Sequence, residues 1–353
     1  MAKLARAELF APDEIACVHV MNRAVRRAYL MGEDPLTGKN YDHRRKWMEE
    51  RLKHFAGLFG IDLLAFAILS NHFHLVLRSR PDVVAQWGDS EVARRWMLIC
   101  PLRKHGDGPP MEPSEPELNS IRNDPVRLAE IRSRLSDISW WMRLLCQYVG
   151  QRANRETEET GKFWESRFKA VRLLDEAAIL ACSAYVDLNP IRSGMAKTLE
   201  ESDYTSAHLR LLSMVDEVGE HALATTSKSS QDGFLAPVRN SELRDAIGAN
   251  LSQSTSRCSN KGFLNISRKE YLTLLDETAR RAIPGKRGST PKELAPLLER
   301  VGLHVKTWFC LIEHFGQLFY NVAGQPQEIA KTRTRKRGVR YRVRTCVKEA
   351  FLS

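Results

Sequence analysis

The sequence predicts an α+β fold, in which a ferredoxin-like split β-α-β antiparallel sheet carries helices on one face and a small C-terminal helical domain follows. Its hydrophobic segments occur in the order strand, helix, two strands, helix, strand, and the two middle strands are joined by a tight turn. We expect the second face of this sheet to be free for a ligand. Beyond residue 215 the composition shifts to Ser, Thr, Gln, Asn and Gly, which indicates the end of the first unit.

The first half of that unit is predicted from periodicity. Residues 15–24 alternate like a strand, and from 43 to 59 apolar residues recur at helical spacing until Gly60 ends the helix. Residues 61–70 and 71–80 are typical of two strands that form a hairpin.

The second half begins with a short helix over 91–101, followed by a Gly- and Pro-rich surface loop over 104–125. A long helix is expected from about 126 to 155, because apolar side chains form one stripe along it. A strand over 167–173 and a helix over 175–190, which ends where Asn precedes Pro, complete the order.

The chain is therefore expected to divide into a domain over 1–215, a polar linker over 216–262, a small helical domain over 263–330 and a basic tail over 331–353. Fourteen residues of the tail, KTRTRKRGVRYRVR, include eight Lys or Arg. Such a tail either is solvated or binds phosphates. Its candidate DNA-binding residues are Arg335, Lys336 and Arg337.

Charge and composition favour a polyanionic partner. The net charge is +11 and the sequence pI is about 9.4, which makes nucleic acid the first candidate. The seven cysteines are scattered, with no Cys-x-x-Cys pair, and no segment is apolar enough to span a membrane. We expect a cytoplasmic, nucleoid-associated protein without a membrane partner.

Two histidines one residue apart stand out in the stretch SNHFHLVL. In a strand, His72 and His74 point to one face while Phe73, Leu75 and Leu77 point to the other. Two neutral imidazoles can supply two ligands to one divalent metal, with a third ligand from another element. The alternative is a solvated sheet face with two ordinary histidines.

Four boxes decide how these histidines are interpreted. HVMNR lies in the first strand, SNHFHLVL in the hairpin, GKFWESRFKA after the long helix and AYVDLNPIRSG beyond it. With these boxes in this order, residues 1 to about 200 resemble the single-tyrosine transposases of the HUH endonuclease superfamily, and most closely the REP-associated branch.

This resemblance implies a single-stranded DNA endonuclease and strand transferase. In that family the histidine pair, here His72 and His74, holds Mg²⁺ or Mn²⁺ against the scissile phosphate. A tyrosine on the helix before the FWESRF box, here Tyr148, attacks the phosphorus and leaves a 5'-phosphotyrosine link with a free 3'-hydroxyl. Single-stranded or hairpin DNA is then the partner, and a homodimer is compatible with this reading.

An amide completes the metal shell in such proteins, and two residues compete for that role. Gln151 follows Tyr148 by three residues and shares its helix face. Asn154 is the rival, although six residues turn a helix by about 240°, so that Tyr148 and Asn154 would not share a face. The alternative role for Tyr148 is packing beside Leu144 and Leu145.

The remaining candidates are weaker. Arg167 and Lys169 are expected to contact the DNA backbone, although Arg167 could instead pair with a nearby carboxylate. His19 either flanks the site or is a structural histidine, and YVDLNPIR is interpreted as a helix end fixed through Asn189.

Two other functions remain open. A non-catalytic nucleic-acid-binding regulator would use the same scaffold. A water-using hydrolase would need a general base, for which Asp62 is the nearest acid in the sequence.

Overall fold

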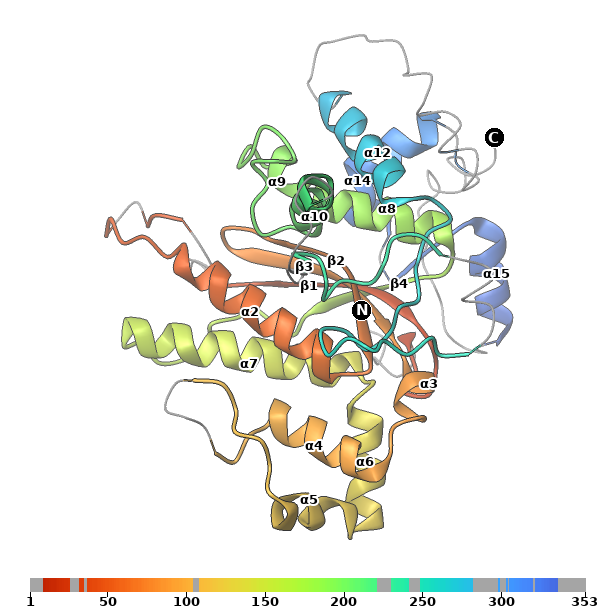
Figure 1. The fold of residues 1–353 in the computed structure, drawn as a ribbon. Coiled ribbons are helices and arrows are strands. Elements are labelled where there is room, and N and C mark those ends of the chain that lie inside the picture. The colour runs from red at the N-terminus through yellow and green to blue at the C-terminus, as the bar shows by residue number, and fades with distance from the viewer. Residues whose placement is uncertain are drawn as a thin grey trace.

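The structure is a computed structural model that describes residues 9–25, 32–34, 37–103, 108–220, 230–240, 248–281, 298, 303, 305–319 and 321–335. A mixed sheet lies at its centre, between two layers of helices (Figure 1). Its strands are β1 (Cys17–Arg23), β2 (Ile61–Ile68), β3 (His72–Ser79), β4 (Lys169–Leu173) and β5 (Val322–Ala323).

The sheet has the order β2-β3-β1-β4-β5. Its first four strands are antiparallel neighbours, and the crossing connections between them are those of the ferredoxin-like split β-α-β arrangement. The predicted α+β class is therefore confirmed. The short strand β5 pairs in parallel with β4 and adds a fifth strand that the sequence did not indicate.

Alternation along β3 separates two cores. Phe73, Leu75 and Leu77 are buried in one hydrophobic cluster, whereas Val76 belongs to another on the opposite face. Because side chains alternate along the strand, His72 and His74 lie on the same face as Val76. The register places Met21 of β1 beside His74.

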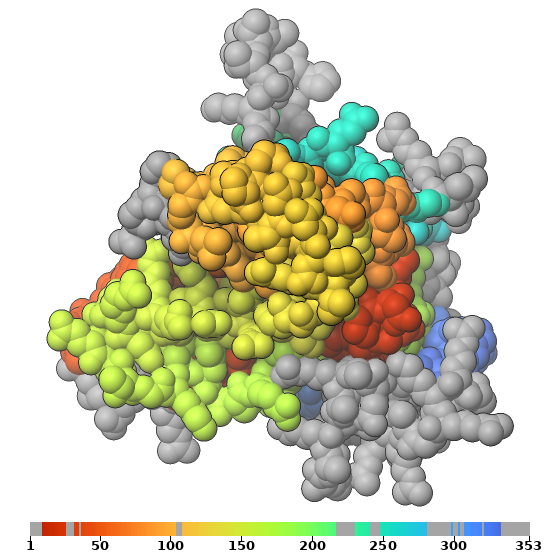
Figure 2. Space-filling model, turned by 90° about the horizontal axis from the view of Figure 1, so that it is seen from below, coloured from red at the N-terminus to blue at the C-terminus, as the bar shows by residue number. Residues whose placement is uncertain are grey.

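The first face is covered by two long helices that run side by side (Figure 1). Trp141, Leu145 and Val149 of α7 are fully buried against the sheet and α2. In Figure 2 the surface of α4 to α6 forms a rounded mass beside the yellow-green surface of α7. Helices on this side are α2 (His43–Leu58), α3 (Pro81–Val84), α4 (Asp89–Ile99), α5 (Glu115–Arg122), α6 (Pro125–Arg134) and α7 (Ile138–Thr157).

The predicted long helix over 126–155 is in fact two helices. The chain breaks between α6 and α7, where the Asp137 carboxylate accepts a hydrogen bond from the backbone N–H of Ser139 and caps α7. The predicted loop over 104–125 contains α5, which begins at a capping box formed by Ser114 and Glu117. Capping residues, which neither hydrophobic period nor Gly and Pro content registers, thus set both of these helix starts.

The second face, expected to be free, is covered by α8 and by helices from the C-terminal third (Figure 1). Helix α8 is buried nearly all round, since Leu180 and Ala184 pack in the same cluster as Val76, and Trp308 of α14 belongs to that cluster too. The helices here are α8 (Glu176–Asp187), α9 (Asn189–Arg192), α10 (Ser206–Glu220), α12 (Arg268–Arg281) and α14 (Val305–Leu318).

Of the predicted linker over 216–262, residues 216–220 end α10, and residues 230–240 and 248–262 pack against the sheet. Ala236 N–H donates to the carbonyl of Leu63 at 2.9 Å, and Ser259 Oγ donates to the buried Asp62 carboxylate at 2.7 Å. Burial opposes the charge on Asp62, but Arg78 and Arg80 outweigh it and hold the pKa of Asp62 below its usual range. A polar segment can thus be structural when buried charges need partners.

These contacts also remove Asp62 as a general base. It faces Arg78, at the far end of β3 from His72, and its oxygens are occupied by the two arginines and Ser259.

At the C-terminus, α15 (Pro326–Arg335) includes the first residues of the predicted basic tail. Arg335 is its last residue, and Lys336 and Arg337 lie outside the described residues. Within the described part of the chain, no helix combines the length and the apolar character needed to cross a bilayer.

Candidate active site

The histidine pair lies where β3 begins, next to the end of β1. His74 is only 2% exposed, and its Nδ1 lies 2.9 Å from Nε2 of His19 on β1. The two rings stack, with centroids 5.1 Å apart. His72 is half-buried, and its register partner Arg23 is exposed. His74 is therefore the buried member of the histidine pair, and His72 is the more exposed one.

Hydrogen bonds orient both imidazoles. Asn71 Oδ1 lies 2.8 Å from Nδ1 of His72, an acceptor that places a proton on that nitrogen. A lone pair on Nε2 of His19 would do the same for Nδ1 of His74. With the proton on Nδ1, Nε2 of each ring keeps its lone pair for another partner. This geometry agrees with the interpretation of His19 as a residue that flanks the site.

All three rings are neutral at pH 7. Burial lowers the pKa of His19 to about 4, and burial together with the nearby Arg23 cation lowers that of His72 to about 4. Burial, followed by the neighbouring histidines, takes the pKa of His74 well below its ordinary value. Neutral imidazole is the form that binds metal ions.

The end of α8 and the start of α9 bring two further groups to this cluster. The Tyr185 ring stands perpendicular to the His74 ring, with centroids 5.6 Å apart. Asn189, which follows Tyr185 by four residues, directs its carboxamide at His74, with Nδ2 3.4 Å from Nε2. The i, i+4 spacing puts the phenol and the amide on one helix face.

Tyr185 is held from its other side by α14. Phe315 stacks on the tyrosine ring, with centroids 5.7 Å apart. A Cβ added at Gly316 would lie 3.2 Å from the Tyr185 hydroxyl, so that glycine leaves the space the hydroxyl occupies. Burial raises the pKa of Tyr185, although a hydrogen bond with Asn189 counteracts part of that rise. The phenol is therefore protonated at rest.

These donors fit a divalent cation. The His72 and His74 ring centroids lie 5.1 Å apart, and the Asn189 carboxamide lies against Nε2 of His74. A half-turn of that amide would present to a cation the oxygen that Mg²⁺ and Mn²⁺ prefer. The described residues contain no group of three or more His, Cys, Asp or Glu side chains placed to hold a metal. The candidate set therefore consists of two imidazoles and one amide, with positions left for substrate oxygens.

The structure does not bring Tyr148 to the histidines, which corrects the predicted site. Tyr148 lies on α7, whose buried side packs against the Phe73 face of the sheet, opposite the face that carries His74. Its hydroxyl accepts a hydrogen bond from Arg152 at 2.7 Å, and Arg51 lies 4.6 Å from its ring centroid.

The two amides proposed beside Tyr148 lie on the same wrong face. Gln151 is exposed, and Asn154 donates to the carbonyl of Gly161 at 3.0 Å, which fixes the turn after α7. The whole sheet thus separates Gln151 and Asn154 from the histidine pair.

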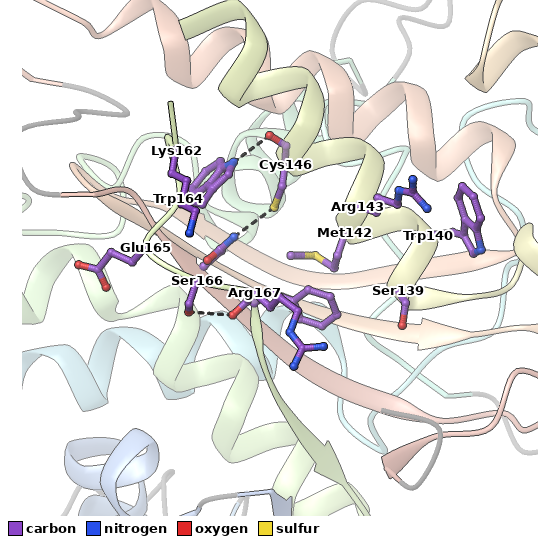
Figure 3. A pocket seen from close by; sticks show the side chains of 12 residues that line it. Ser139, Trp140, Met142, Arg143, Cys146, Lys162, Trp164, Glu165, Ser166 and Arg167 are labelled. Carbon is purple, nitrogen blue, oxygen red and sulfur yellow. Dashed lines mark hydrogen bonds between the residues drawn. The ribbon is translucent and has the colours of Figure 1, made fainter. Parts of the chain in front are cut away.

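The two predicted DNA contacts beyond α7 lie on different faces. Lys169 is exposed, and it pairs in register with Met21, which in turn pairs with His74, so Lys169 belongs to the histidine face. Arg167 lines a cavity beside α7 (Figure 3).

Sequence reasoning missed Tyr185 and Asn189, although two signals were present. The spacing Tyr-x-x-x-Asn puts both polar side chains on one helical face. Residues 177–182, AAILAC, are apolar all round the helix, which indicates burial between two layers. A polar face on such a helix is directed at something specific.

Comparison with known proteins adds little to this geometry. No family model and no curated protein matches the sequence. A solved structure of a REP-associated tyrosine transposase bound to a REP hairpin is similar over 65% of this chain and 96% of its own, at 11% sequence identity and a TM-score of 0.33. Such a similarity does not relate individual residues, and the assignments below rest on side-chain geometry.

Proposed function

We propose that this chain nicks and rejoins single-stranded DNA through a tyrosine nucleophile, and that the nucleophile is Tyr185. One observation carries the proposal: the phenol of Tyr185, the amide of Asn189 and the paired imidazoles meet at one end of the sheet. A nucleophile beside a candidate metal site is the arrangement that phosphoryl transfer requires.

The proposed reaction exchanges one phosphate ester bond for another, so it needs neither water nor an external energy source. The Tyr185 oxygen bonds to phosphorus as the bond to the 3'-oxygen breaks, and the phenol proton ends on the released 3'-hydroxyl. The product is a 5'-phosphotyrosine, which the 3'-hydroxyl can attack in reverse. A divalent cation held by His72, His74 and Asn189 would supply a Lewis acid for a phosphate oxygen.

Neighbouring residues support a nucleic-acid substrate. Arg23 is an exposed cation in register with His72. Lys169 is also exposed, and it pairs with Met21, which in turn pairs with His74. The net charge of +11 favours the same partner. Their role is to position the DNA backbone.

A second candidate function has its own support. Helix α14 packs on Tyr185 through Phe315 and leaves the hydroxyl little room at Gly316. A chain whose tyrosine stays covered in this way would be a non-catalytic DNA-binding regulator on the same scaffold.

The test is a denaturing gel that detects protein covalently attached to labelled DNA. A library of single-stranded oligonucleotides with hairpins next to randomised sequence serves as substrate, with Mn²⁺ present. Tyr185→Phe removes one oxygen and should eliminate the adduct, whereas Tyr148→Phe on the opposite face should form as much adduct as wild type.

Loss of the adduct in Tyr148→Phe with retention in Tyr185→Phe would reverse the assignment. If wild type binds the library but forms no adduct with any member, the regulator is correct and the endonuclease is wrong.

A further inference from the structure

A cavity of about 640 Å³ lies on the face of the sheet opposite the histidines, between α7 and residues 162–168 (Figure 3). Its floor includes Asn22 of β1, whose amide donates to the sulfur of Cys146 at 3.3 Å. This volume is in the range of small-molecule sites and accommodates one nucleotide. The reaction proposed above does not use it.

Two indoles line the cavity, and one is fixed in place. Trp164 Nε1 donates to the carbonyl of Cys146 at 2.8 Å. Edge contacts with Phe73 and Phe163, at centroid distances of 5.5 and 4.9 Å, hold the ring from the sides. Because the ring is already oriented, a flat ligand would not have to order it. Trp140 provides the second indole.

The rim of the cavity is cationic. Arg143, Lys162 and Arg167 are exposed, and within the described part of the chain no carboxylate forms an ion pair with any of the three. Arg143 also lies 4.8 Å from the ring centroid of Trp140. Glu165 is the one acidic residue of the lining, and in Figure 3 its carboxylate is turned away from both arginines. The rim therefore attracts an anion attached to an apolar ring.

The geometry points to a pocket for one unpaired nucleotide of single-stranded DNA, with its base against Trp164 and its phosphate at Arg143 and Arg167. Aromatic faces combined with cations are how proteins bind single strands without reading their sequence. This inference rests on the proposed function for its choice of DNA as the polyanion.

The position of the cavity relative to the histidines suits one continuous strand. Asn22 pairs in register with Phe73, and the next residues along, Arg23 and His72, are also partners. The cavity and the histidine site are therefore back to back across the ends of β1 and β3. A strand that passes around these ends reaches both.

Binding is measured by fluorescence anisotropy with a labelled, unstructured oligothymidylate, in EDTA so that no metal-dependent reaction contributes. We expect Arg143→Ala and Arg167→Ala each to weaken binding about tenfold and to reduce the salt slope by about 0.7, the contribution of one phosphate contact. Arg155→Ala is the matched control, because Arg155 is an exposed arginine of α7 that does not line the cavity. It should bind within twofold of wild type.

A second measurement tests stacking and location. An oligonucleotide of abasic sites should bind wild type about tenfold more weakly than oligothymidylate, since one stacked base is lost. Bound oligothymidylate should also slow alkylation of Cys146, in the cavity, but not of Cys100, which is similarly exposed and outside it.

Equal binding by wild type, Arg143→Ala and Arg167→Ala would overturn the pocket, as would equal affinity for the abasic strand. Protection of neither cysteine would do the same. The adduct gel is independent of this outcome: its failure would leave the metal-free binding results as they stand, and loss of the pocket would not affect the assignment of Tyr185.

Discussion

The two faces of the sheet are made from alternate residues of the same strands, yet they carry different kinds of polar group. On the α8 face, Tyr185, Asn189 and the histidines point at one another. On the α7 face, Tyr148 and Asn154 point at a neighbouring arginine and a turn carbonyl. Residue types suited to catalysis therefore occur on both sides, and only their convergence distinguishes the site from the scaffold.

The largest expected effect is a difference in cleavage activity between variants on the two faces of the sheet. His74→Ala removes a proposed ligand and should reduce cleavage by at least about 1,000-fold, because the nucleophile loses its adjacent Lewis acid. Gln151→Ala, on the other face, should cleave like wild type. The measurement is single-turnover nicking with Mn²⁺, after circular dichroism has shown that both variants are folded. Full activity in His74→Ala would remove the metal site.

The two asparagines give a finer comparison. Asn189→Ala should weaken Mn²⁺ binding by about 10- to 100-fold, whereas Asn154→Ala should leave it unchanged. Isothermal titration of Mn²⁺ into each variant in the absence of DNA checks this. The opposite ranking would return the amide ligand to α7.

Acidity should destabilise the histidine face. The folded-state pKa of His19 is about 4, below the ordinary value of 6.5, so the unfolded chain binds more protons between these values. Stability is then full above pH 6.5 and falls as the pH drops toward 4, by up to about 3 kcal/mol for this histidine. Urea unfolding of the metal-free protein at pH 7 and pH 5 measures it. His19→Leu should show a smaller difference between the two pH values, and an unchanged difference would contradict the cause.

The smallest effect is expected from Tyr148→Phe. It loses one hydrogen bond from Arg152 at a half-buried position, which should cost about 1 kcal/mol of unfolding free energy. Urea unfolding at pH 7 is the measurement. A loss of 3 kcal/mol or more would mean that the α7 face depends on this tyrosine more than its contacts indicate.

Sequence patterning was reliable where one period dominated. The alternation of Phe73, Leu75 and Leu77 against the histidines assigned the two faces of β3 correctly, and the order of strands and helices along the chain indicated the fold class. It could not tell which helix covers which face, because the apolar stripe of α7 and the nearly all-round burial of α8 fit either face of the sheet. The predicted nucleophile, Tyr148, therefore lies on a helix that packs against the face opposite the histidines.

The polar segment after residue 215 shows a second limit. Composition alone indicated a linker, yet Ser259 is fully buried and donates a hydrogen bond to the Asp62 carboxylate. Sequence shows that a residue is polar but not that a buried charge elsewhere requires it.

The short parallel pairing of β5 with β4 also affects how the molecule is made. During synthesis on the ribosome the first four strands and α8 leave the exit tunnel long before Phe315 and β5. Until then the nascent chain carries Tyr185 without its stacked partner and β4 with unpaired backbone groups, which are templates for association with other chains. The part of the protein proposed to do chemistry is thus the last to be enclosed, and premature termination would release it uncovered.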